Sequence, residues 1–133
     1  MKKLTEKEIL ELLDEAIAAR ENAYAKYSNF KVGAVVVDET GRHFKGANVE
    51  NGSYGLSNCG ERSAIFSAIS NGMKKISIIC VVADTSKPVS PCGACRQVIS
   101  EFADENTIII LGNLKRDYIL NTMEDLLPYG FSL

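Results

Sequence analysis

Residues 32–49 read VGAVVVDETGRHFKGANV, and this stretch decides which fold the chain can adopt. Residues 32–37 are rich in β-branched side chains, which are typical of a strand. Residues 38–41 form a polar turn in which Gly41 can adopt a positive φ. Residues 43–49 then return as the second strand of a β-hairpin. The stretch therefore predicts the first two strands of a sheet.

Predicted helices and strands alternate after this hairpin. A loop rich in Asn, Ser and Gly follows at residues 51–58. Helices are predicted over residues 59–70 and 92–102, and strands over residues 75–82, 107–111 and 118–121. Such alternation favours one mixed sheet that carries helices on both faces.

Capping signals mark a helix near each end of the chain. Thr5 and Glu8 fit a capping box, and the apolar spacing that follows predicts a helix over residues 6–24. Thr122 is a second cap, for a short helix that Pro128 ends. We therefore expect residues 1–133 to form a single α/β domain, a three-layer α/β/α sandwich around one mixed five-stranded sheet.

Composition argues against several classes of partner. The net charge is −2 and the basic residues are scattered among acids, so no nucleic-acid partner is expected. No apolar run approaches the roughly 20 residues that cross a bilayer, so no membrane partner is expected either. The N-terminal stretch lacks the apolar core of a signal peptide, which favours a cytoplasmic protein with reduced thiols. The four cysteines are therefore interpreted as ligands rather than as disulfides.

Two cysteine-containing stretches carry the chemistry. Residues 58–62 read NCGER, and residues 90–96 read SPCGACR. Cys92 and Cys95 are three residues apart, so they share one face of a helix and can hold one metal ion. Cys59 and Glu61 would point about 200° apart on a helix, so both can face that ion only if Cys59 lies in the first turn or just before it.

Three thiolates leave the fourth position of a tetrahedral zinc ion open, which is typical of a catalytic site. We therefore predict one zinc ion per chain, held by Cys59, Cys92 and Cys95. Glu61 would carry protons beside it. Arg62 and Arg96 follow two of the predicted site residues directly. We expect both to donate hydrogen bonds to sulfur and so to offset the excess negative charge of the thiolates.

Simpler explanations of the cysteines are open at this point. A lone Cys-x-x-Cys pair can be a dithiol redox centre, or half of a structural zinc site in a binding module. Cys80 is the spare thiol, but it falls in a predicted buried strand, where cysteine is usually an apolar filler. His43 follows the hairpin turn and suits a surface or strand residue better than a ligand. The position of Glu61 and the odd number of site thiols argue against both the dithiol redox centre and the structural zinc site.

The combined pattern resembles the zinc-dependent nucleobase deaminases, whose signature includes a Cys₃ variant. Over almost its whole length the chain is similar to the small homotetrameric cytidine deaminases. The matching motifs are YSxFxVGA at residues 27–34, NVEN at residues 48–51, SPCGACRQ at residues 90–97 and LLPxxF at residues 126–131. Polynucleotide and deoxynucleotide deaminases usually carry histidine where this chain has Cys59.

This resemblance implies hydrolytic deamination of cytidine and 2′-deoxycytidine to uridine and 2′-deoxyuridine, as in pyrimidine salvage. It implies that hydroxide on the zinc attacks C4, while Glu61 carries protons to N3 and then to the leaving amine. The implied substrate contacts are the Phe30 ring on the base, Asn48 and Glu50 at the ribose hydroxyls, the Gly60 N–H at O2 and the Ser90 carbonyl at the amine. Tyr54 and Phe131 resemble residues that complete a neighbouring subunit's pocket, which implies a homotetramer with shared active sites.

Two positions refine this resemblance. Position 60 is Gly where the family usually has Ala, and glycine lowers helix preference by about 1 kcal/mol. The Glu50 carboxylate would repel a 5′-phosphate in a low-dielectric pocket, which favours a nucleoside over a nucleotide or a polynucleotide.

The closest rival function is that of a deaminase of a blasticidin-type nucleoside antibiotic, since that family shares the metal motif. Asn48, Glu50 and Phe131 are the residues that distinguish cytidine deamination from deamination of such an antibiotic.

Overall fold

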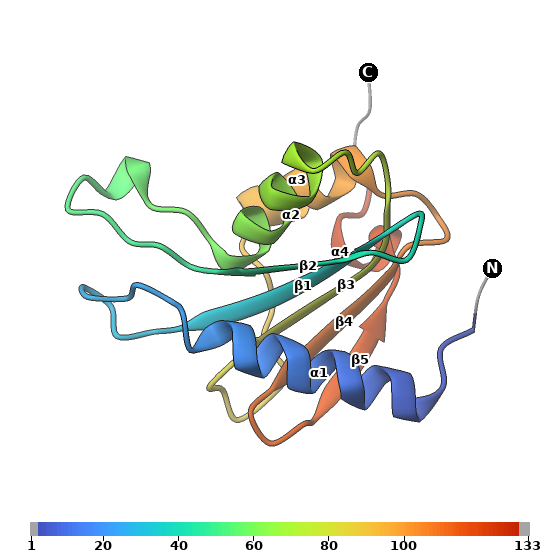
Figure 1. Ribbon diagram of the computed structural model, residues 1–133, viewed down its shortest axis with the longest axis horizontal. Helices are drawn as coiled ribbons and strands as arrows, with labels where there is room; N and C mark the ends of the chain where they lie inside the picture. Colours follow the sequence, from blue (N-terminus) through green and yellow to red (C-terminus); the bar gives the residue numbers. More distant parts are fainter. Residues whose placement is uncertain (1–2, 131–133) are drawn as a thin grey trace.

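The structure is a computed structural model that describes residues 3–130 (Figure 1). The helices are α1 (Glu6–Arg20), α2 (Gly60–Ser70), α3 (Gly93–Phe102) and α4 (Met123–Leu126), with a 3₁₀ turn η1 (Tyr54–Leu56). The strands are β1 (Val32–Asp38), β2 (His43–Ala47), β3 (Ile76–Ala83), β4 (Ile108–Asn113) and β5 (Tyr118–Asn121). The predicted order of helices and strands is confirmed, and β5 has the predicted bounds.

One five-stranded sheet forms the centre of the fold, in the order β2-β1-β3-β4-β5. β1 is antiparallel to both β2 and β3, and β5 is antiparallel to β4. β3 and β4 are parallel and are joined through α3, because a parallel pair needs a crossover connection. The sheet is therefore mixed, as predicted.

Alternate side chains of β1 face two separate cores. Ala34 and Val36 belong to the core that includes residues of α2 and α3. Val35 and Val37 belong to the core that includes residues of α1. This is the two-residue period of a strand, with both faces buried. Figure 1 shows α1 on one side of the sheet and α2 and α3 on the other, so the predicted three-layer sandwich is confirmed.

Two elements end earlier than predicted. α1 ends at Arg20 instead of continuing to residue 24. The Tyr24 backbone is used elsewhere, because its N–H donates to Asn48 O at 2.9 Å and its carbonyl accepts from Glu50 N at 2.8 Å. β2 ends at Ala47 instead of at residue 49, because the residues that follow it pair with the Tyr24 backbone.

The pairing of β1 with β3 brings the two cysteine stretches to one edge of the sheet. Val32 begins β1 and is paired with Ala83, which ends β3 and leads towards α3. The end of β2, which leads towards α2, lies beside the same end of β1. α2 packs closely on β2 because Gly46 has no side chain: a Cβ there would lie 2.3 Å from the Ala64 backbone nitrogen.

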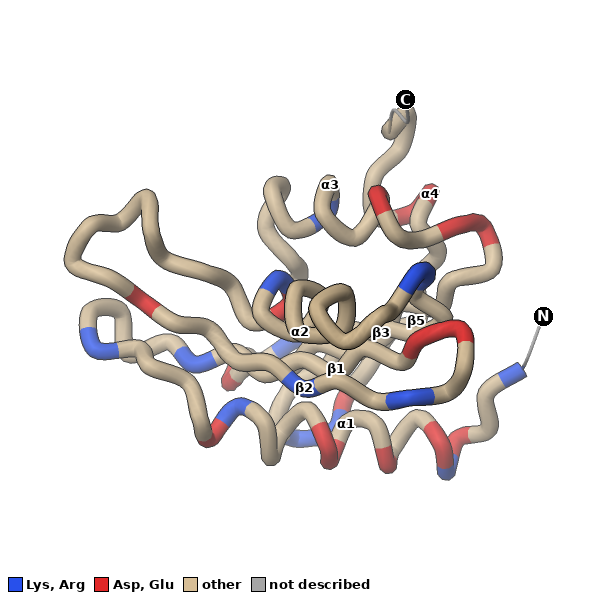
Figure 2. Tube along the Cα trace, turned by 45° about the horizontal axis from the view of Figure 1, so that its top comes forward, with Lys and Arg blue, Asp and Glu red and all other residues tan. Residues whose placement is uncertain are grey.

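Charged side chains of both signs are spread along the chain. Figure 2 shows Lys and Arg interspersed with Asp and Glu, an arrangement unlike the clustered basic face of nucleic-acid-binding domains. Within residues 3–130, no helix combines the length and the apolar character needed to span a membrane.

Candidate active site

Three cysteine side chains converge where α2 and α3 begin. Cys59 is the N-cap of α2 and Cys92 is the N-cap of α3, both with extended backbone. Cys95 follows near the start of α3 and is buried. The Cys59 and Cys92 Sγ atoms are 3.9 Å apart, and those of Cys92 and Cys95 are 3.3 Å apart. All three sulfur atoms lie within 4.8 Å of one another.

This cluster fits one zinc ion. Tetrahedral zinc with Zn–S bonds of about 2.3 Å places its sulfur ligands about 3.8 Å apart. The N-cap position of Cys59 also lets its sulfur face the same centre as the first turn of α2. Three protein ligands leave one tetrahedral position for water or substrate, which distinguishes a catalytic zinc site from a structural one.

Arg62 brings positive charge to the thiols. Its Nη2 donates to the Cys59 Sγ at 3.1 Å, which is the hydrogen bond expected from the sequence. A hydrogen bond with Cys95, together with the Arg62 guanidinium, lowers the pKa of Cys59 to about 5. The Arg62 Nε is buried and has no hydrogen-bond partner among residues 3–130. A spare donor here suits sulfurs that are all thiolates, the form that binds a metal.

Glu61 is buried beside the thiols in the first turn of α2. Only 4% of its surface is exposed. Burial raises the pKa of its carboxyl group above the ordinary value for Glu, and the neighbouring Cys59 thiolate adds to the rise. A carboxyl group with a raised pKa holds a proton more readily, so it can accept a proton and return it during a reaction.

A cavity of about 410 Å³ opens onto these groups, and we call it the site cavity. Its volume lies in the range of small-molecule sites. The predicted site residues that line it are Phe30, Asn48, Glu50, Tyr54, Cys59, Gly60, Glu61, Arg62, Ser90 and Cys92. The fold thus brings together residues from four separate segments of the sequence.

Asn48 and Glu50 hold the segment that carries Phe30. The buried Asn48 side chain accepts from the Val32 N–H and donates to the Phe30 carbonyl, both at 2.8 Å. The Glu50 carboxylate accepts from the Ser28 hydroxyl and from two backbone N–H groups at 2.8 and 3.0 Å. These hydrogen bonds, that of the Ser28 side chain above all, lower the pKa of Glu50. The Glu50 carboxylate is therefore held in place by hydrogen bonds and kept ionised where it lines the site cavity.

Among residues 3–130, the predicted site residues Cys95 and Arg96 do not line the site cavity. Cys95 is buried and belongs to the thiol cluster. Phe131 lies outside the described residues. Arg96 was expected to donate to sulfur, and this prediction is wrong. Its guanidinium nitrogens donate instead to three oxygen atoms, which are Pro91 O, Leu126 O and Ser90 Oγ.

Several residues of the cavity wall were not among the predicted site residues. Val32 and Val89 give the wall apolar surface, and Ser28, Ser57 and Asn58 line it as well. In the sequence, Val32 belongs to the family motif at residues 27–34 and starts a predicted strand, whereas Val89 lies in a predicted loop. A hydrophobic residue ahead of a metal-ligand motif would have been the only available signal for Val89.

The two other residues considered as ligands lie elsewhere. Cys80 is fully buried in β3, within the core that includes residues of α1, as expected for an apolar filler. His43 begins β2, and its Nδ1 is 2.9 Å from the Glu15 Oε2 on α1. Neither belongs to the cluster of three thiols.

Known proteins resemble this chain over most of its length. It is 51% identical over 121 residues to the cytidine deaminase of Halalkalibacterium halodurans, covering 91% of this chain and 92% of that protein. It is 34% identical over 109 residues to the blasticidin-S deaminase of Bacillus cereus, covering 76% of each.

The fold is shared with solved structures as well. The crystal structure of cytidine deaminase from Burkholderia pseudomallei matches with a TM-score of 0.89 at 47% identity, covering 96% of this chain and 100% of that one. The sequence model of the cytidine and deoxycytidylate deaminase zinc-binding region matches residues 6–111. The chain therefore belongs to the cytidine and deoxycytidylate deaminase family.

Proposed function

We propose that this chain catalyses the zinc-dependent hydrolysis of cytidine and 2′-deoxycytidine to uridine and 2′-deoxyuridine, with release of ammonia. One observation carries the proposal: three thiols and a buried carboxyl group converge on a single cavity of small-molecule size. The near-complete coverage by a relative named cytidine deaminase supports the choice of substrate.

The metal would be held by Cys59, Cys92 and Cys95, one zinc ion per chain. When bound, zinc supplies a Lewis acid that activates water at neutral pH. Arg62 would offset the excess negative charge of three thiolates through its hydrogen bond to Cys59. Both N-cap cysteines also lie at the positive ends of helix dipoles, which favours their thiolate form. A cytoplasmic location would keep these thiols reduced.

Glu61 would move the protons of the reaction. Burial raises the pKa of its carboxyl group, so it can take one proton from water and pass it to the pyrimidine N3. It would then take the second proton from the hydroxyl group added at C4 and pass it to the amine, which leaves as ammonia. The Gly60 N–H at the start of α2 would bind the pyrimidine O2, since N–H groups of a first helical turn have no partner within the helix. The Ser90 carbonyl would accept from the amine.

Phe30, Asn48 and Glu50 would bind the rest of the nucleoside. Phe30 is 42% exposed and offers its ring to the base. Asn48 and Glu50 have more donor and acceptor sites than their present hydrogen bonds use, so they can also bind ribose hydroxyls. The charge of Glu50 would repel a 5′-phosphate in a low-dielectric cavity, which favours a nucleoside over a nucleotide or a nucleic acid.

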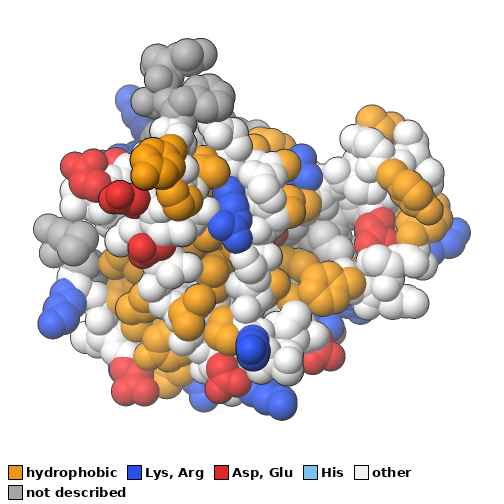
Figure 3. Space-filling model, turned by 180° about the vertical axis from the view of Figure 1, so that it is seen from behind, with side chains coloured by type: hydrophobic (Ala, Val, Ile, Leu, Met, Phe, Trp, Pro, Cys, Tyr) orange, Lys and Arg blue, Asp and Glu red, His pale blue; other side chains and the backbone are white. Residues whose placement is uncertain are grey.

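We further propose a homotetramer with shared active sites. The segment between β2 and α2 projects from the rest of the fold and carries Tyr54 and Leu56, which are 79% and 72% exposed. Figure 3 shows hydrophobic side chains on this projecting lobe. Exposed apolar surface of this kind is typical of protein contacts. Tyr54 also lines the site cavity, so a subunit packed there would close the cavity, with Phe131 as a further contributor.

A substrate panel tests the proposed function. One zinc per chain by elemental analysis is expected, together with loss of cytidine absorbance on incubation. The relative named blasticidin-S deaminase makes blasticidin S the second candidate substrate. Turnover of blasticidin S without turnover of cytidine would overturn the proposal in favour of that rival. A preference for deoxycytidylate over deoxycytidine would contradict the role given to Glu50.

A further inference from the structure

Arg96 connects three parts of the chain next to the thiol cluster. It follows Cys95 near the start of α3. Its Nε donates to Pro91 O at 3.0 Å, its Nη1 to Leu126 O at 2.6 Å and its Nη2 to the Ser90 hydroxyl at 2.5 Å. Every side-chain nitrogen is thus used, and all three acceptors are uncharged. A guanidinium with this many oriented contacts holds its surroundings firmly.

The cavity wall before α3 depends on this side chain. Cys92 is fixed by the helix itself, since its carbonyl accepts from the Arg96 backbone N–H at 3.1 Å. Ser90 and Pro91 precede the helix, and Pro91 has no N–H with which to join it. Ser90 nevertheless lines the site cavity. Its place in the wall is therefore set by a long side chain more than by regular secondary structure.

The third contact braces the guanidinium against the core. Leu126 ends α4, and its side chain is 2% exposed within the core that includes residues of α2 and α3. The Arg96 side chain therefore spans from a rigid part of the fold to the less regular stretch that forms the wall. A lysine cannot do the same, because an ammonium is a point donor and cannot meet three acceptors around one plane.

We propose that Arg96 is a positioning residue that fixes Ser90 in the wall of the site cavity and thereby sets the affinity for the nucleoside without holding the metal. This inference rests on the proposed cytidine deamination. It separates two neighbouring tasks: α3 places the metal ligands Cys92 and Cys95, and Arg96 places the wall beside them.

Kinetics with cytidine, zinc analysis and calorimetric binding of the product uridine test this role in Arg96→Gln and Arg96→Lys. Arg96→Gln should keep one zinc per chain and a kcat within about threefold of the unaltered chain. Its KM and its Kd for uridine should both rise roughly 10- to 100-fold, the range expected when hydrogen bonds to a charged group are lost. Arg96→Lys should behave more like Arg96→Gln than like the unaltered chain.

A matched control comes from Arg116, an exposed arginine whose guanidinium binds Asp14 of α1. Arg116→Gln should leave KM, kcat and uridine affinity unchanged. Unchanged KM and uridine affinity in both Arg96 variants would overturn the proposal. Loss of zinc together with activity would overturn it as well, because Arg96 would then be supporting the metal ligands.

Ser90→Ala removes one acceptor of Arg96 and keeps the backbone carbonyl. It should raise KM and the uridine Kd by less than Arg96→Gln does. The double variant should bind no more weakly than Arg96→Gln alone, because both changes break the same contact. Additive effects would overturn the proposal. Where Arg96→Gln fails to fold, unchanged KM and uridine affinity in Ser90→Ala would overturn it instead. Failure of the unaltered chain to deaminate cytidine would overturn the proposed function itself.

Discussion

Two cavities of this molecule are equal in size and differ in chemistry. The site cavity and a second hollow, which we call the distal cavity, each measure about 410 Å³. They lie at opposite ends of β1, since Val32 lines the site cavity while Val37 and Asp38 line the distal cavity. In the site cavity, two thiols and the buried Glu61 carboxyl group are available to a metal or a substrate.

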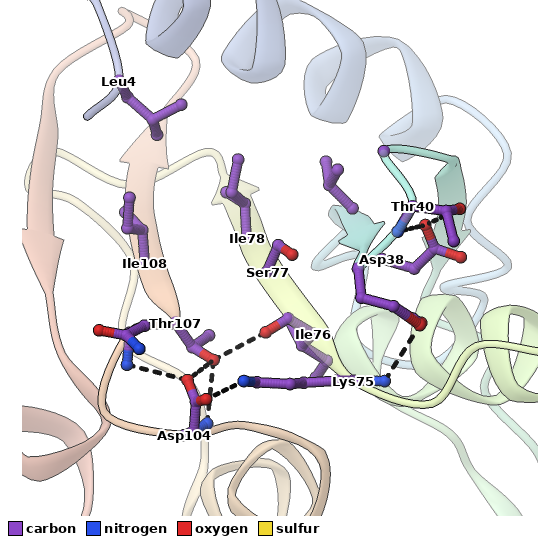
Figure 4. Close-up of a pocket in the computed structure, with 14 residues that line it drawn as sticks. Leu4, Asp38, Thr40, Lys75, Ile76, Ser77, Ile78, Asp104, Thr107 and Ile108 are labelled. Carbon is purple, nitrogen blue, oxygen red and sulfur yellow. Dashed lines mark hydrogen bonds and ion pairs between the residues drawn. The ribbon is translucent and has the colours of Figure 1, made fainter. Parts of the chain in front are cut away.

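In the distal cavity, the charged side chains are already bound to other groups of the protein. Figure 4 shows Lys75 paired with Asp104, and the Thr107 hydroxyl donating to Ile76 O, a distance of 2.7 Å. The Glu39 carboxylate at the same edge accepts from the Lys74 backbone N–H at 3.0 Å. Cavity volume therefore does not distinguish a functional site here. The distinguishing property is a set of polar groups that the fold has not used to stabilise itself.

Two buried carboxyl groups show the same contrast between a group available for chemistry and a group used to stabilise the fold. Burial raises the pKa of Glu61, and the hydrogen bonds and the Arg62 charge around it do not outweigh that rise. Burial also acts to raise the pKa of Asp38, but hydrogen bonds from Thr40 and Arg42 outweigh it and lower that pKa to about 2. The first group is suited to exchanging protons, and the second is suited to remaining ionised as part of the turn between β1 and β2.

The largest effect is expected from a change in the site cavity. Glu61→Ala should lower kcat roughly 100- to 10,000-fold, because it removes the group that transfers protons. Zinc should be retained, since all three thiols remain. The nearly isosteric Glu61→Gln should be equally inactive, which separates loss of the acid from loss of volume. Cytidine absorbance and elemental analysis check both points, and normal turnover in either variant would show that Glu61 is not the proton carrier.

The matching change in the distal cavity should affect stability and leave activity intact. Asp104→Ala removes the partner of Lys75 and the acceptor of the Asn106 N–H at 2.8 Å. The free energy of unfolding should fall by about 1–2 kcal/mol, because the ion pair is partly exposed and the lost hydrogen bond is local. Urea unfolding measures this loss. A fall in kcat with zinc retained would mean that the two cavities are coupled along β1.

A smaller effect should appear in acid and depend on Asp38. Its pKa is lower in the folded chain than in the unfolded chain, so its contribution to stability is complete above about pH 4 and is lost as the pH falls towards 2. Asp38→Asn removes this dependence. The difference in urea midpoint between the unaltered chain and the variant should therefore shrink between pH 5 and pH 3. A difference that stays constant over this range would contradict the assigned pKa.

The sequence was most informative where the structure is local. Spacing of three residues predicted that Cys92 and Cys95 share one metal, and the capping boxes at Thr5 and Thr122 are both present. In each case the interacting groups are within one helical turn of each other, so sequence spacing fixes their geometry. Resemblance to a family then extended the prediction to the residues around the substrate.

The sequence was least informative where distant segments meet. Arg96 binds the carbonyl of Leu126, 30 residues away, and nothing in either local pattern indicates that contact. The bond between Ser28 and Glu50 spans 22 residues and has the same character. The early end of α1 has this cause too, because the Tyr24 backbone pairs with a segment beyond β2. Such contacts follow from the packing of the whole sheet and cannot be derived from periodicity.

The smallest effect is expected at Gly60, where the chain departs from the alanine usual in the family. A Cβ at this position would lie 3.0 Å from the Val32 O and 3.2 Å from its Cγ1, so Val32 would have to shift slightly. That carbonyl also accepts from the Asn48 N–H at 3.2 Å. Against this cost, alanine gains up to about 1 kcal/mol in helix preference. Gly60→Ala should therefore change the free energy of unfolding by less than about 1 kcal/mol, and KM should rise only a few-fold because Val32 lines the site cavity.

The matched control is Gly93→Ala at the first position of α3, where an added methyl group meets no atom within 4 Å. An equal gain in stability from both variants, measured by urea unfolding, would show that Val32 yields without cost and that Gly60 is not required by the packing of this site.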